Sequence, residues 1–328
     1  MAPRKGLEAI DLLLRDLLQS DLPFGEKLIV LGGDLRQILP IVELGDRSQQ
    51  MGECLKMSPL WEHFLQFKLR NNMRVSDSNQ AEWKEYLLAV GEGRVPLLSD
   101  SCIPIPSSLH CQTDLVDKVY EDIETFNSDL SQLAILTSTN VNALMLNEKV
   151  LLKLPGSLFE CKSIDEVVTE TPSDALNFPT ELLNQITPSG MPPHVLNLKK
   201  GAIGMLLRNL NVKDGLCNGT RLIVQNVGRR ILSCVIATGS RMGDDCYYDS
   251  CKLPFRFRRR QFPVRLSFAM TINKAQGQSF DRIGICFTDR IFSHGQLYVA
   301  LSRARSQDGV FIECSEDSMT NVVYSEVL

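Results

Sequence analysis

The sequence predicts an α/β fold that carries a small, basic β module. Two apolar runs of strand length, 27–34 and 133–136, end in glycine or polar residues, as strands buried in a parallel sheet do. The second run continues into a turn and a helical pattern at 141–152, an order typical of α/β proteins. Short strand-like segments between 202 and 237, separated by glycine and asparagine turns, predict the module, a small β-barrel or β-sheet.

The chain begins with an amphipathic helix, which ends at the turn residues 21–25. Its apolar residues recur at three- and four-residue spacing: Leu7, Ile10, Leu14, Leu17 and Leu18. The run 27–34 then predicts a strand buried on both faces. Asp34 and Gln37 follow two glycines, so they could hold a water or a phosphate oxygen close to the backbone. A turn capped by Asp34 is the alternative interpretation.

Further elements are expected along the chain. In order they are an alternating strand at 65–74, a helix at 81–90, a loop at 100–108, a helix at 114–126, an irregular excursion at 160–193 with a short helix at 180–185, and strands at 202–207, 220–227, 231–237 and 309–313.

The stretch from Phe262 to Arg305 combines a buried run with polar and basic residues. The apolar run 264–269 leads to Gly277 through four polar residues: Thr271, Asn273, Lys274 and Gln276. Open α/β sheets bind ligands at such strand ends. Leu297, Ala300, Leu301 and Ala304 then form one helical stripe. Arg303 and Arg305 lie off this stripe, and arginine suits phosphate oxygens. A surface helix with solvated arginines is the alternative.

The charge is unevenly distributed. A net charge of −4 alone argues against a nucleic-acid-binding protein, but Val195 to Arg265 contain 14 Lys and Arg against 4 Asp and Glu. The densest arginines are Arg256, Arg258, Arg259, Arg260 and Arg265. A basic segment within an acidic protein favours binding of a polyanion such as nucleic acid, although arginines on solvated loops give the same count.

Composition argues against several other classes. A chain of 328 residues is long enough for two domains. It has no apolar run near the roughly 20 residues that cross a bilayer, and its N-terminus lacks the apolar core of a secretory signal. Ten scattered cysteines form no Cys-x-x-Cys pair, the closest being Cys246 and Cys251, and only four histidines are present. This pattern argues against a zinc site or a disulfide framework and favours free thiols in a reducing compartment.

Eight segments together resemble the petite-integration-frequency (PIF-type) DNA helicases of superfamily one, most of all the branch that includes Helitron transposons. They follow the family's order, at 23–25, 32–42, 69–74, 136–140, 178–184, 206–211 with 215–221, 263–278 and 298–303. Each segment alone is weak evidence, but eight in order identify the chain as a member of the family.

The resemblance implies a domain plan. An incomplete first RecA-like domain is expected at 1–112. The second RecA-like domain is expected to begin at 113–194, to be interrupted by the small basic β module at 195–261, and to end at 262–328.

The resemblance also implies roles in nucleotide sensing. Asp34 and Gln37 match the third helicase motif, whose glutamine senses the γ-phosphate. Arg74 and Arg303 match the two arginines that reach that phosphate from the cleft. Gly277 belongs to the fifth motif, which joins the nucleotide cleft to DNA. Gln37, Arg74 and Arg303 are therefore the expected catalytic residues, and the expected nucleotide-binding residues are Asp34, Gln37, Arg74, Gly277 and Arg303.

Contacts to nucleic acid are implied for a second group. Thr137 and Asn140 lie where the family contacts the translocated strand, and the fifth motif adds three further contacts: Thr271, Lys274 and Gln276. The basic module is expected to hold phosphates without reading bases, through Arg258, Arg259 and Arg260.

Two family motifs are absent from the sequence. It contains no Gly-x-x-x-x-Gly-Lys-Ser/Thr loop, which would cradle phosphates and supply a magnesium hydroxyl, and no Asp-Glu box precedes the run 27–34. The resemblance implies ATP and Mg²⁺ as cofactors, but their principal ligands would then be missing. We expect a chain that begins just after the acidic box and lacks autonomous ATPase activity. A longer transcript that supplies an N-terminal ATP-binding segment remains open.

Three functional hypotheses follow. The first is ATP-dependent 5′-to-3′ DNA unwinding in replication, repair, recombination or transposition, with single-stranded or forked DNA as partner. The family's habit favours the nucleus, with the mitochondrion as the alternative. The second is a remnant that binds single-stranded nucleic acid without enzymatic activity. The third is a non-functional product whose exposed half-sheet favours aggregation. The oligomeric state is open.

Overall fold

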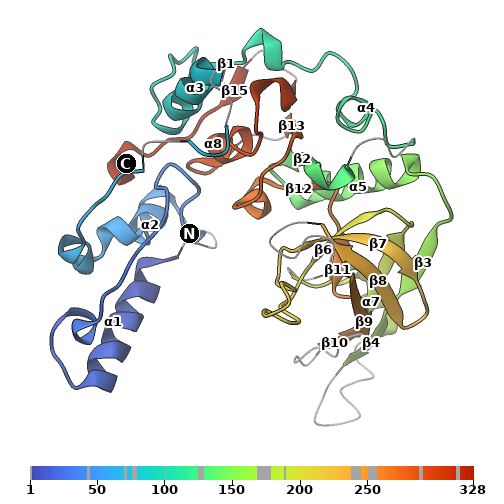
Figure 1. Ribbon diagram of the computed structural model, residues 1–328, viewed down its shortest axis with the longest axis horizontal. Helices are drawn as coiled ribbons and strands as arrows, with labels where there is room; N and C mark the ends of the chain where they lie inside the picture. Colours follow the sequence, from blue (N-terminus) through green and yellow to red (C-terminus); the bar gives the residue numbers. More distant parts are fainter. Residues whose placement is uncertain are drawn as a thin grey trace. The chain divides into compact units, whose positions relative to one another are not determined.

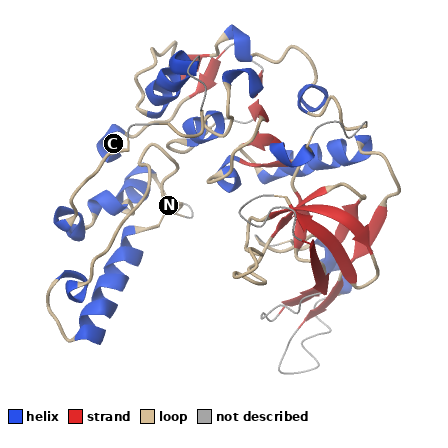
Figure 2. Ribbon diagram, in the orientation of Figure 1, coloured by secondary structure: helices blue, strands red, loops and turns tan. Residues whose placement is uncertain are grey.

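The computed structural model describes residues 2–42, 45–69, 72–75, 80–99, 101–124, 129–167, 179–187, 190–237, 245–249, 257–287, 291–314 and 318–328 (Figures 1 and 2). The chain divides into two compact units. The first contains Met1–His110, Ala275–Ser279 and Phe287–Leu328, and the second contains Cys111–Lys274 and Phe280–Cys286. The boundaries predicted from the sequence separate RecA-like domains from a β module and are not boundaries of these compact units, so they remain predictions.

The first unit is mainly helical. Its helices are α1 (Arg4–Leu18), α2 (Arg47–Gly52), α3 (Ala81–Gly91) and α8 (Gln296–Leu301), and its strands are β1 (Cys102–Pro104), β14 (Val310–Cys314) and β15 (Ser318–Thr320). The helices predicted at the N-terminus and at 81–90 and the strand predicted at 309–313 are thus confirmed. The predicted loop 100–108 instead contains β1, which pairs with β15 in antiparallel register. Residue 100 lies outside the described part.

One face of α1 is buried. Leu7 packs in a small core with Phe24 and Leu60. The buried Asp11 accepts a hydrogen bond from the Phe24 N–H at 2.6 Å, which fixes the turn after the helix. Elsewhere on the helix, Leu12 and Leu17 are each 68% exposed. The apolar spacing therefore predicts the helix correctly, but much of its apolar surface faces solvent.

The predicted strand at 27–34 is wrong. The backbone forms no strand there, and Leu28 and Val30 are 91% and 84% exposed. The predicted strand at 65–74 is also wrong over its described part, where Phe67 and Leu69 are 88% and 98% exposed; residues 70–71 lie outside that part. A strand needs neighbours to satisfy its backbone groups, and no described strand pairs with either run.

The second unit confirms the predicted α/β signal. β2 (Leu133–Thr137) is fully buried and lies between two parallel neighbours, β12 (Ala269–Thr271) and β13 (Arg282–Phe287). α5 (Asn140–Lys153) follows β2 directly, as the sequence predicts, and packs against β2 and β12 (Figure 1). The strand predicted at 264–269 is divided in two, because Ser267 and Phe268 separate β12 from β11 (Val264–Leu266). The helix predicted at 114–126 is shorter over its described part, at α4 (Leu115–Val119); residues 125–126 lie outside that part.

The β module is an antiparallel sheet with the strand order β11-β6-β7-β8-β9. Its remaining strands are β6 (Ile203–Leu206), β7 (Arg221–Val227), β8 (Ile231–Ile236) and β9 (Asp245–Asp249). The three predicted strands between 202 and 237 are thus confirmed. The supposedly irregular stretch 160–193 contains α7 (Thr180–Gln185), as predicted, but also β3 (Phe159–Lys162) and β4 (Ile164–Val167). These pair with β5 (Val195–Leu198) and β10 (Phe257–Arg260), respectively, and Figure 2 shows strands concentrated in this part of the chain.

Candidate functional site

The turn at Asp34 is fastened to α8 within the first unit. The Asp34 carboxylate accepts hydrogen bonds from the Arg36 Nε at 2.9 Å and from the Tyr298 hydroxyl at 3.0 Å. Burial alone would raise the pKa of Asp34, but the hydrogen bonds and charge of Arg36 outweigh it and hold that pKa below its ordinary value. Burial also raises the pKa of Tyr298 to about 12, so its hydroxyl stays a donor. Asp34 therefore positions the turn that carries Gln37.

Gly295 allows this contact. It precedes α8 with φ +73°, and a Cβ on it would lie 2.3 Å from the Arg36 carbonyl oxygen and 2.7 Å from the Gln37 carbonyl carbon. Only glycine combines this backbone conformation with so close an approach. The sequence contains this glycine beside the predicted helix, but only the fold shows that it packs against the segment of Gln37.

Arg74 and Arg303, which belong to motifs far apart in the sequence, come together in the first unit. Arg303 is 1% exposed, and its guanidinium donates to the Val299 carbonyl at 3.0 Å and to the Gln278 carbonyl at 3.2 Å. Arg74 donates to the Ser302 carbonyl at 2.9 Å and to the Ser279 hydroxyl at 2.7 Å. Both guanidinium groups thus contact the segment that follows Gly277 or the end of α8.

The two arginines act on each other electrostatically. Burial, followed by the charge of Arg74, lowers the pKa of Arg303 to about 10, and burial also lowers the pKa of Arg74. Neither forms an ion pair with a carboxylate in the described part of the chain. Two close cations held by neutral acceptors favour binding of an anion, since its negative charge would offset both the cost of burying the cations and their mutual repulsion.

Gly277 has φ +80° and open space at its Cβ position, so glycine is needed there because of the backbone conformation of the turn.

His294 holds the same region through its neutral ring. Its Nδ1 accepts a hydrogen bond from the Tyr324 N–H at 2.9 Å, so Nε2 carries the proton that is donated to the Leu35 carbonyl at 2.8 Å. The ring is fully buried, and burial lowers its pKa. Protonation of Nδ1 would break the bond to Tyr324.

We therefore expect the first unit to lose stability as the pH falls from 7 to 5. The unfolded chain protonates His294 near its ordinary pKa of about 6.5, whereas the folded chain protonates it only at lower pH. The contribution is thus complete above that value and lost as the pH falls below it. Urea unfolding followed by fluorescence would measure this, because Trp61 and Trp83 both belong to the first unit. His294→Gln should flatten the pH dependence, whereas replacement of the exposed His63 should not; equal slopes for both variants would contradict the expectation.

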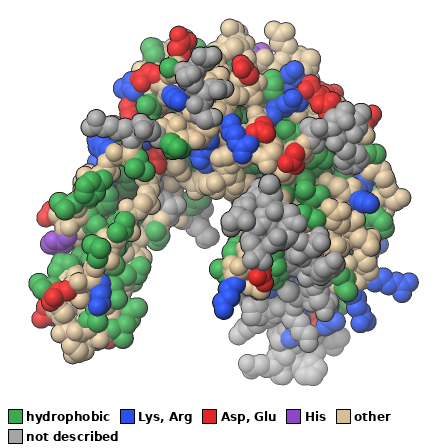
Figure 3. All heavy atoms as spheres, in the orientation of Figure 1, with side chains coloured by type: hydrophobic (Ala, Val, Ile, Leu, Met, Phe, Trp, Pro, Cys, Tyr) green, Lys and Arg blue, Asp and Glu red, His purple; other side chains and the backbone are tan. Residues whose placement is uncertain are grey.

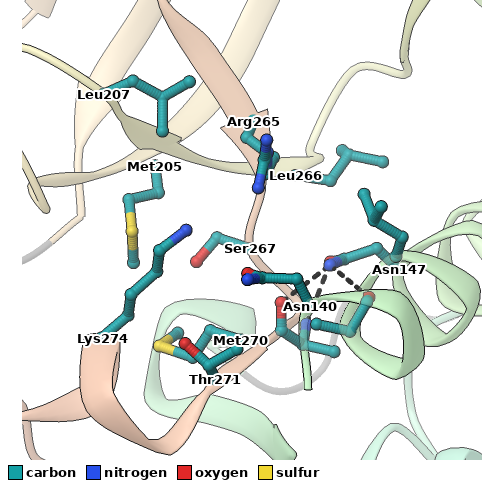
Figure 4. Close-up of a pocket in the computed structure, with 13 residues that line it drawn as sticks. Asn140, Asn147, Met205, Leu207, Arg265, Leu266, Ser267, Met270, Thr271 and Lys274 are labelled. Atoms are coloured by element: carbon teal, nitrogen blue, oxygen red, sulfur yellow. Dashed lines mark hydrogen bonds between the residues drawn. The ribbon is translucent and has the colours of Figure 1, made fainter. Parts of the chain in front are cut away.

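A small pocket in the second unit gathers several predicted nucleic-acid contacts. Asn140, Thr271 and Lys274 line a cavity of about 20 Å³, which has room for about one water. Figure 4 shows these side chains around one hollow between α5 and the strands. Lys274 keeps solvent access, but partial burial, followed by the charge of Arg265, lowers its pKa. The predicted Gln276 is half-buried and does not line this pocket.

Thr137 is a correction. Its side chain is fully buried, and its hydroxyl donates to the Thr139 carbonyl at 2.8 Å. Its side chain therefore shapes the turn before α5 and has no exposed surface with which to contact a nucleic acid.

Arg265, which the sequence placed only within the basic segment, also lines the pocket, and burial lowers its pKa. Sequence reasoning missed other residues of the pocket. Asn147 lines the pocket as well. Its amide oxygen accepts a hydrogen bond from the Ala269 N–H at 3.0 Å, and its amide nitrogen donates one to the Ala269 carbonyl at 2.7 Å, which ties β12 to α5. Met205 supplies an apolar wall. A buried asparagine within an apolar helix pattern is a signal that sequence reading could have used.

The three arginines predicted to bind phosphate in the β module have different environments. Arg259 is a correction: its guanidinium is wholly buried and forms a two-pronged ion pair with Asp165, at 2.9 and 2.7 Å. Arg258 lies 3.5 Å from Glu166 and is partly exposed. Arg260 lines a wide groove. Arg256 lies outside the described residues.

Other kinds of site have no support in the described part of the chain. No group of three His, Cys, Asp or Glu side chains there is placed to hold a metal ion. None of the described helices is both long and apolar enough to span a bilayer.

Comparison with known proteins gives matches along almost the whole chain. Residues 1–101 match the family model "PIF1-like helicase", residues 181–227 match "DNA helicase Pif1, 2B domain", and residues 259–321 match a herpesvirus "Helicase" model. The ATP-dependent DNA helicase PIF1 of Danio rerio is 25% identical over 315 residues, which are 94% of this chain. That of Rattus norvegicus is 36% identical over 173 residues, 51% of this chain and 25% of its own length.

Solved structures agree on the fold. The Pif1 helicase of Candida albicans superposes with a TM-score of 0.67 at 21% identity and covers 100% of this chain and 73% of its own. Bacteroides Pif1 in complex with ADP-AlF3 and single-stranded DNA gives 0.68 at 20% identity, over 99% of this chain and 70% of its own. The α/β fold thus matches that of these RecA-like enzymes. The chain spans 44% of the length of the Danio rerio relative. The family models and the relatives together show that this chain is similar to PIF1-type helicases.

Proposed function

We propose that this chain forms the strand-binding and phosphate-sensing part of an ATP-dependent, 5′-to-3′ DNA helicase of the PIF1 type. One observation carries the proposal: Arg74 and Arg303 lie close enough to interact, and neither forms an ion pair with a carboxylate among the described residues. A pair of buried cations stabilises the charge on a transferring phosphoryl group. Gln37 is anchored beside α8, the helix that leads to Arg303, which supports its role as the sensor.

The DNA partner is proposed to bind the second unit. Lys274 and Arg265 place two cations at a pocket too small for a nucleotide but large enough for one phosphate oxygen. Asn140 is exposed at the same pocket and could donate to the backbone of a strand. Solved relatives are described as bound to single-stranded DNA and as unwinding forked DNA. These observations favour single-stranded or forked DNA as the partner here.

ATP fits this chain in part. The arginine pair suits a γ-phosphate, but the sequence has no glycine-rich Walker loop for the remaining phosphates and the magnesium ion. We propose that this chain alone does not hydrolyse ATP. The assignments to the Helitron-like branch and to the nucleus, with the mitochondrion as the alternative, belong to this proposal and rest on the motifs alone.

Two exposed apolar runs support a partner segment. Leu28, Val30, Phe67 and Leu69 are each more than 80% exposed, and no described strand pairs with either run. Neighbouring strands would cover such side chains and satisfy the backbone. We propose that an ATP-binding segment provides these strands.

Salt-dependent binding of a fluorescent oligothymidine tests the proposal. The affinity of the purified chain should fall steeply as salt rises, because phosphate contacts release counterions. Replacing Lys274 and Arg265 with glutamine should weaken binding and reduce the slope of log affinity against log salt by about 0.7 per lost contact. Lys149→Gln/Lys153→Gln is the control, since both lysines of α5 already pair with Asp114 and Asp117. An affinity that does not vary with salt would contradict strand binding.

The same preparation tests the enzymatic part. ATP turnover should be absent with or without single-stranded DNA. Turnover that disappears on Arg303→Ala would overturn the claim that this chain alone is inactive, while supporting the arginine's role. The second candidate function is strand binding without any link to a nucleotide. It would be favoured if adding the ATP-binding segment of a relative, with ATP, left the affinity of this chain for DNA unchanged.

A further inference from the structure

A second, much wider hollow lies in the second unit, away from the pocket around Lys274. It has a volume of about 790 Å³ and shares no lining residue with that pocket. Its walls come from β3, the start of β4, the end of β10 and the turn between β7 and β8. The volume falls within the range of about 300–1,000 Å³ of sites that enclose small ligands. The groove therefore has room for parts of nucleotides, which the pocket at Lys274 lacks.

Four cations line this groove. The β7–β8 turn is closed by a hydrogen bond from the Gly228 N–H to the Ile231 carbonyl at 2.9 Å, and this turn exposes Arg229 and Arg230. Strand pairing places Arg260 opposite Ile164, near the end of β3 that carries Lys162. Figure 3 shows Lys and Arg side chains at the edge of this unit where the β7–β8 hairpin ends in Figure 1.

Among the residues whose side chains the structure describes, little negative charge opposes the cations of the groove. Its one acid, Glu160, pairs with Lys162 at 3.1 Å. Arg229, Arg230 and Arg260 form no ion pair with any residue that the structure describes. Solvated arginines are common on convex surfaces, but here three converge on a concavity, where their fields add. The groove thus favours a polyanion.

Apolar groups in the same groove indicate which polyanion. Phe159 is 39% exposed and Ile164 57% exposed, and both line the hollow. A duplex keeps its bases stacked inside and has nothing to place against an exposed ring. A single strand offers free base faces, and proteins that bind single strands combine cations with aromatic rings.

We propose that this groove binds a second single-stranded segment of nucleic acid, with phosphates on Arg229, Arg230 and Arg260 and a base on Phe159. The inference rests on the proposed binding of single-stranded DNA and adds a separate track to it. A fork with two single-stranded tails would then occupy both the pocket at Lys274 and the groove, whereas a substrate with one tail would occupy the pocket alone.

Fluorescence anisotropy of the full chain with these two substrates tests the proposal. Arg229→Gln/Arg230→Gln should weaken binding of the two-tailed fork and reduce its salt slope by about 1.4, that is, about 0.7 for each lost contact. Binding of the one-tailed substrate should change less than twofold. Phe159→Ala should weaken binding of the fork about fivefold or more, at the low end of the stacking range, and Phe159→Leu should not restore it.

The controls separate this inference from the proposed function. Lys149→Gln/Lys153→Gln makes the same change in charge on the same unit and should have no effect on either substrate. Lys274→Gln should weaken binding of both substrates. Equal affinities of the wild type and the Arg229→Gln/Arg230→Gln variant for the fork would overturn the groove alone. If the Arg229→Gln/Arg230→Gln variant bound a tailless duplex more weakly than the wild type does, the occupant of the groove would be a duplex, and the single-strand assignment would be overturned. A chain that binds no DNA would overturn both proposals.

Discussion

Asp165→Ala is expected to lower the free energy of unfolding of the second unit by about 3–5 kcal/mol, the range for breaking a buried ion pair by removing one partner. The carboxylate of Asp165 and the guanidinium of Arg259 both have no exposed surface. Without Asp165, the charge of Arg259 would remain buried without its ion-pair carboxylate, next to the carbonyls of Pro192 and Leu183 that its guanidinium bonds. Since Arg259 joins β10, β4 and α7, its loss of position would loosen all three.

The neighbouring residue provides a matched control. Glu166→Ala removes a carboxylate one position along the same strand, but its partner Arg258 is 3.5 Å away and partly exposed. Exposed pairs contribute about 0–1 kcal/mol. Urea unfolding followed by far-ultraviolet circular dichroism would detect the second unit, while the fluorescence of Trp61 and Trp83 would report on the first. Similar losses from both alanine variants would contradict the buried pair's role.

Arg221→Ala is expected to have an effect of similar size, about 3–5 kcal/mol, since it would remove a charged donor from three buried carbonyl oxygens. The Arg221 guanidinium is fully buried and donates to the carbonyls of Ser131 and Leu133 and, at 3.0 Å, to that of Ser267. It also lies 5.1 Å from the centre of the Phe280 ring. One side chain of β7 thus ties the module to β2 and to the segment before β12.

Burial disfavours the charged form of Arg221 and lowers its pKa to about 10. Arg221→Lys should recover only part of the lost stability, as a single ammonium cannot reproduce the planar fork that reaches several carbonyls. Arg229→Ala, on the exposed turn at the other end of β7, should change the stability by less than about 0.5 kcal/mol. Hydrogen exchange of the β2 amides would measure the local effect. Unchanged protection in Arg221→Ala would contradict the predicted tie.

Local pattern was sufficient where an element contains its own determinants. The helices α1, α3 and α5 have apolar residues at helical spacing, and the short strands of the β module are bounded by glycine and asparagine turns, so the sequence predicts both kinds of element. β2 was also predicted correctly. The motif spellings placed Arg74 and Arg303 in one functional group, and the fold brings both to the end of α8.

Burial, in contrast, depends on neighbours that a local pattern does not contain. Residues 28–31 and 133–136 are both wholly apolar, yet Leu136 is fully buried and Leu28 is 91% exposed. β2 has a parallel strand on each side, whereas no described strand pairs with the first run. The apolar pattern indicates that a segment would be stabilised if neighbouring strands buried its side chains. It does not indicate whether those strands are present.

The same distinction applies to the basic segment. The sequence by itself determined that positive charge is concentrated between 195 and 265, and this was enough to indicate a polyanion. Only the tertiary structure decided which arginines are available to it. Arg221 and Arg259 are buried on backbone carbonyls or a carboxylate, while Arg229, Arg230 and Arg260 line a groove. An arginine has the same charge in either place, and its role is set by whether strand pairing places an internal acceptor or an open hollow within its reach.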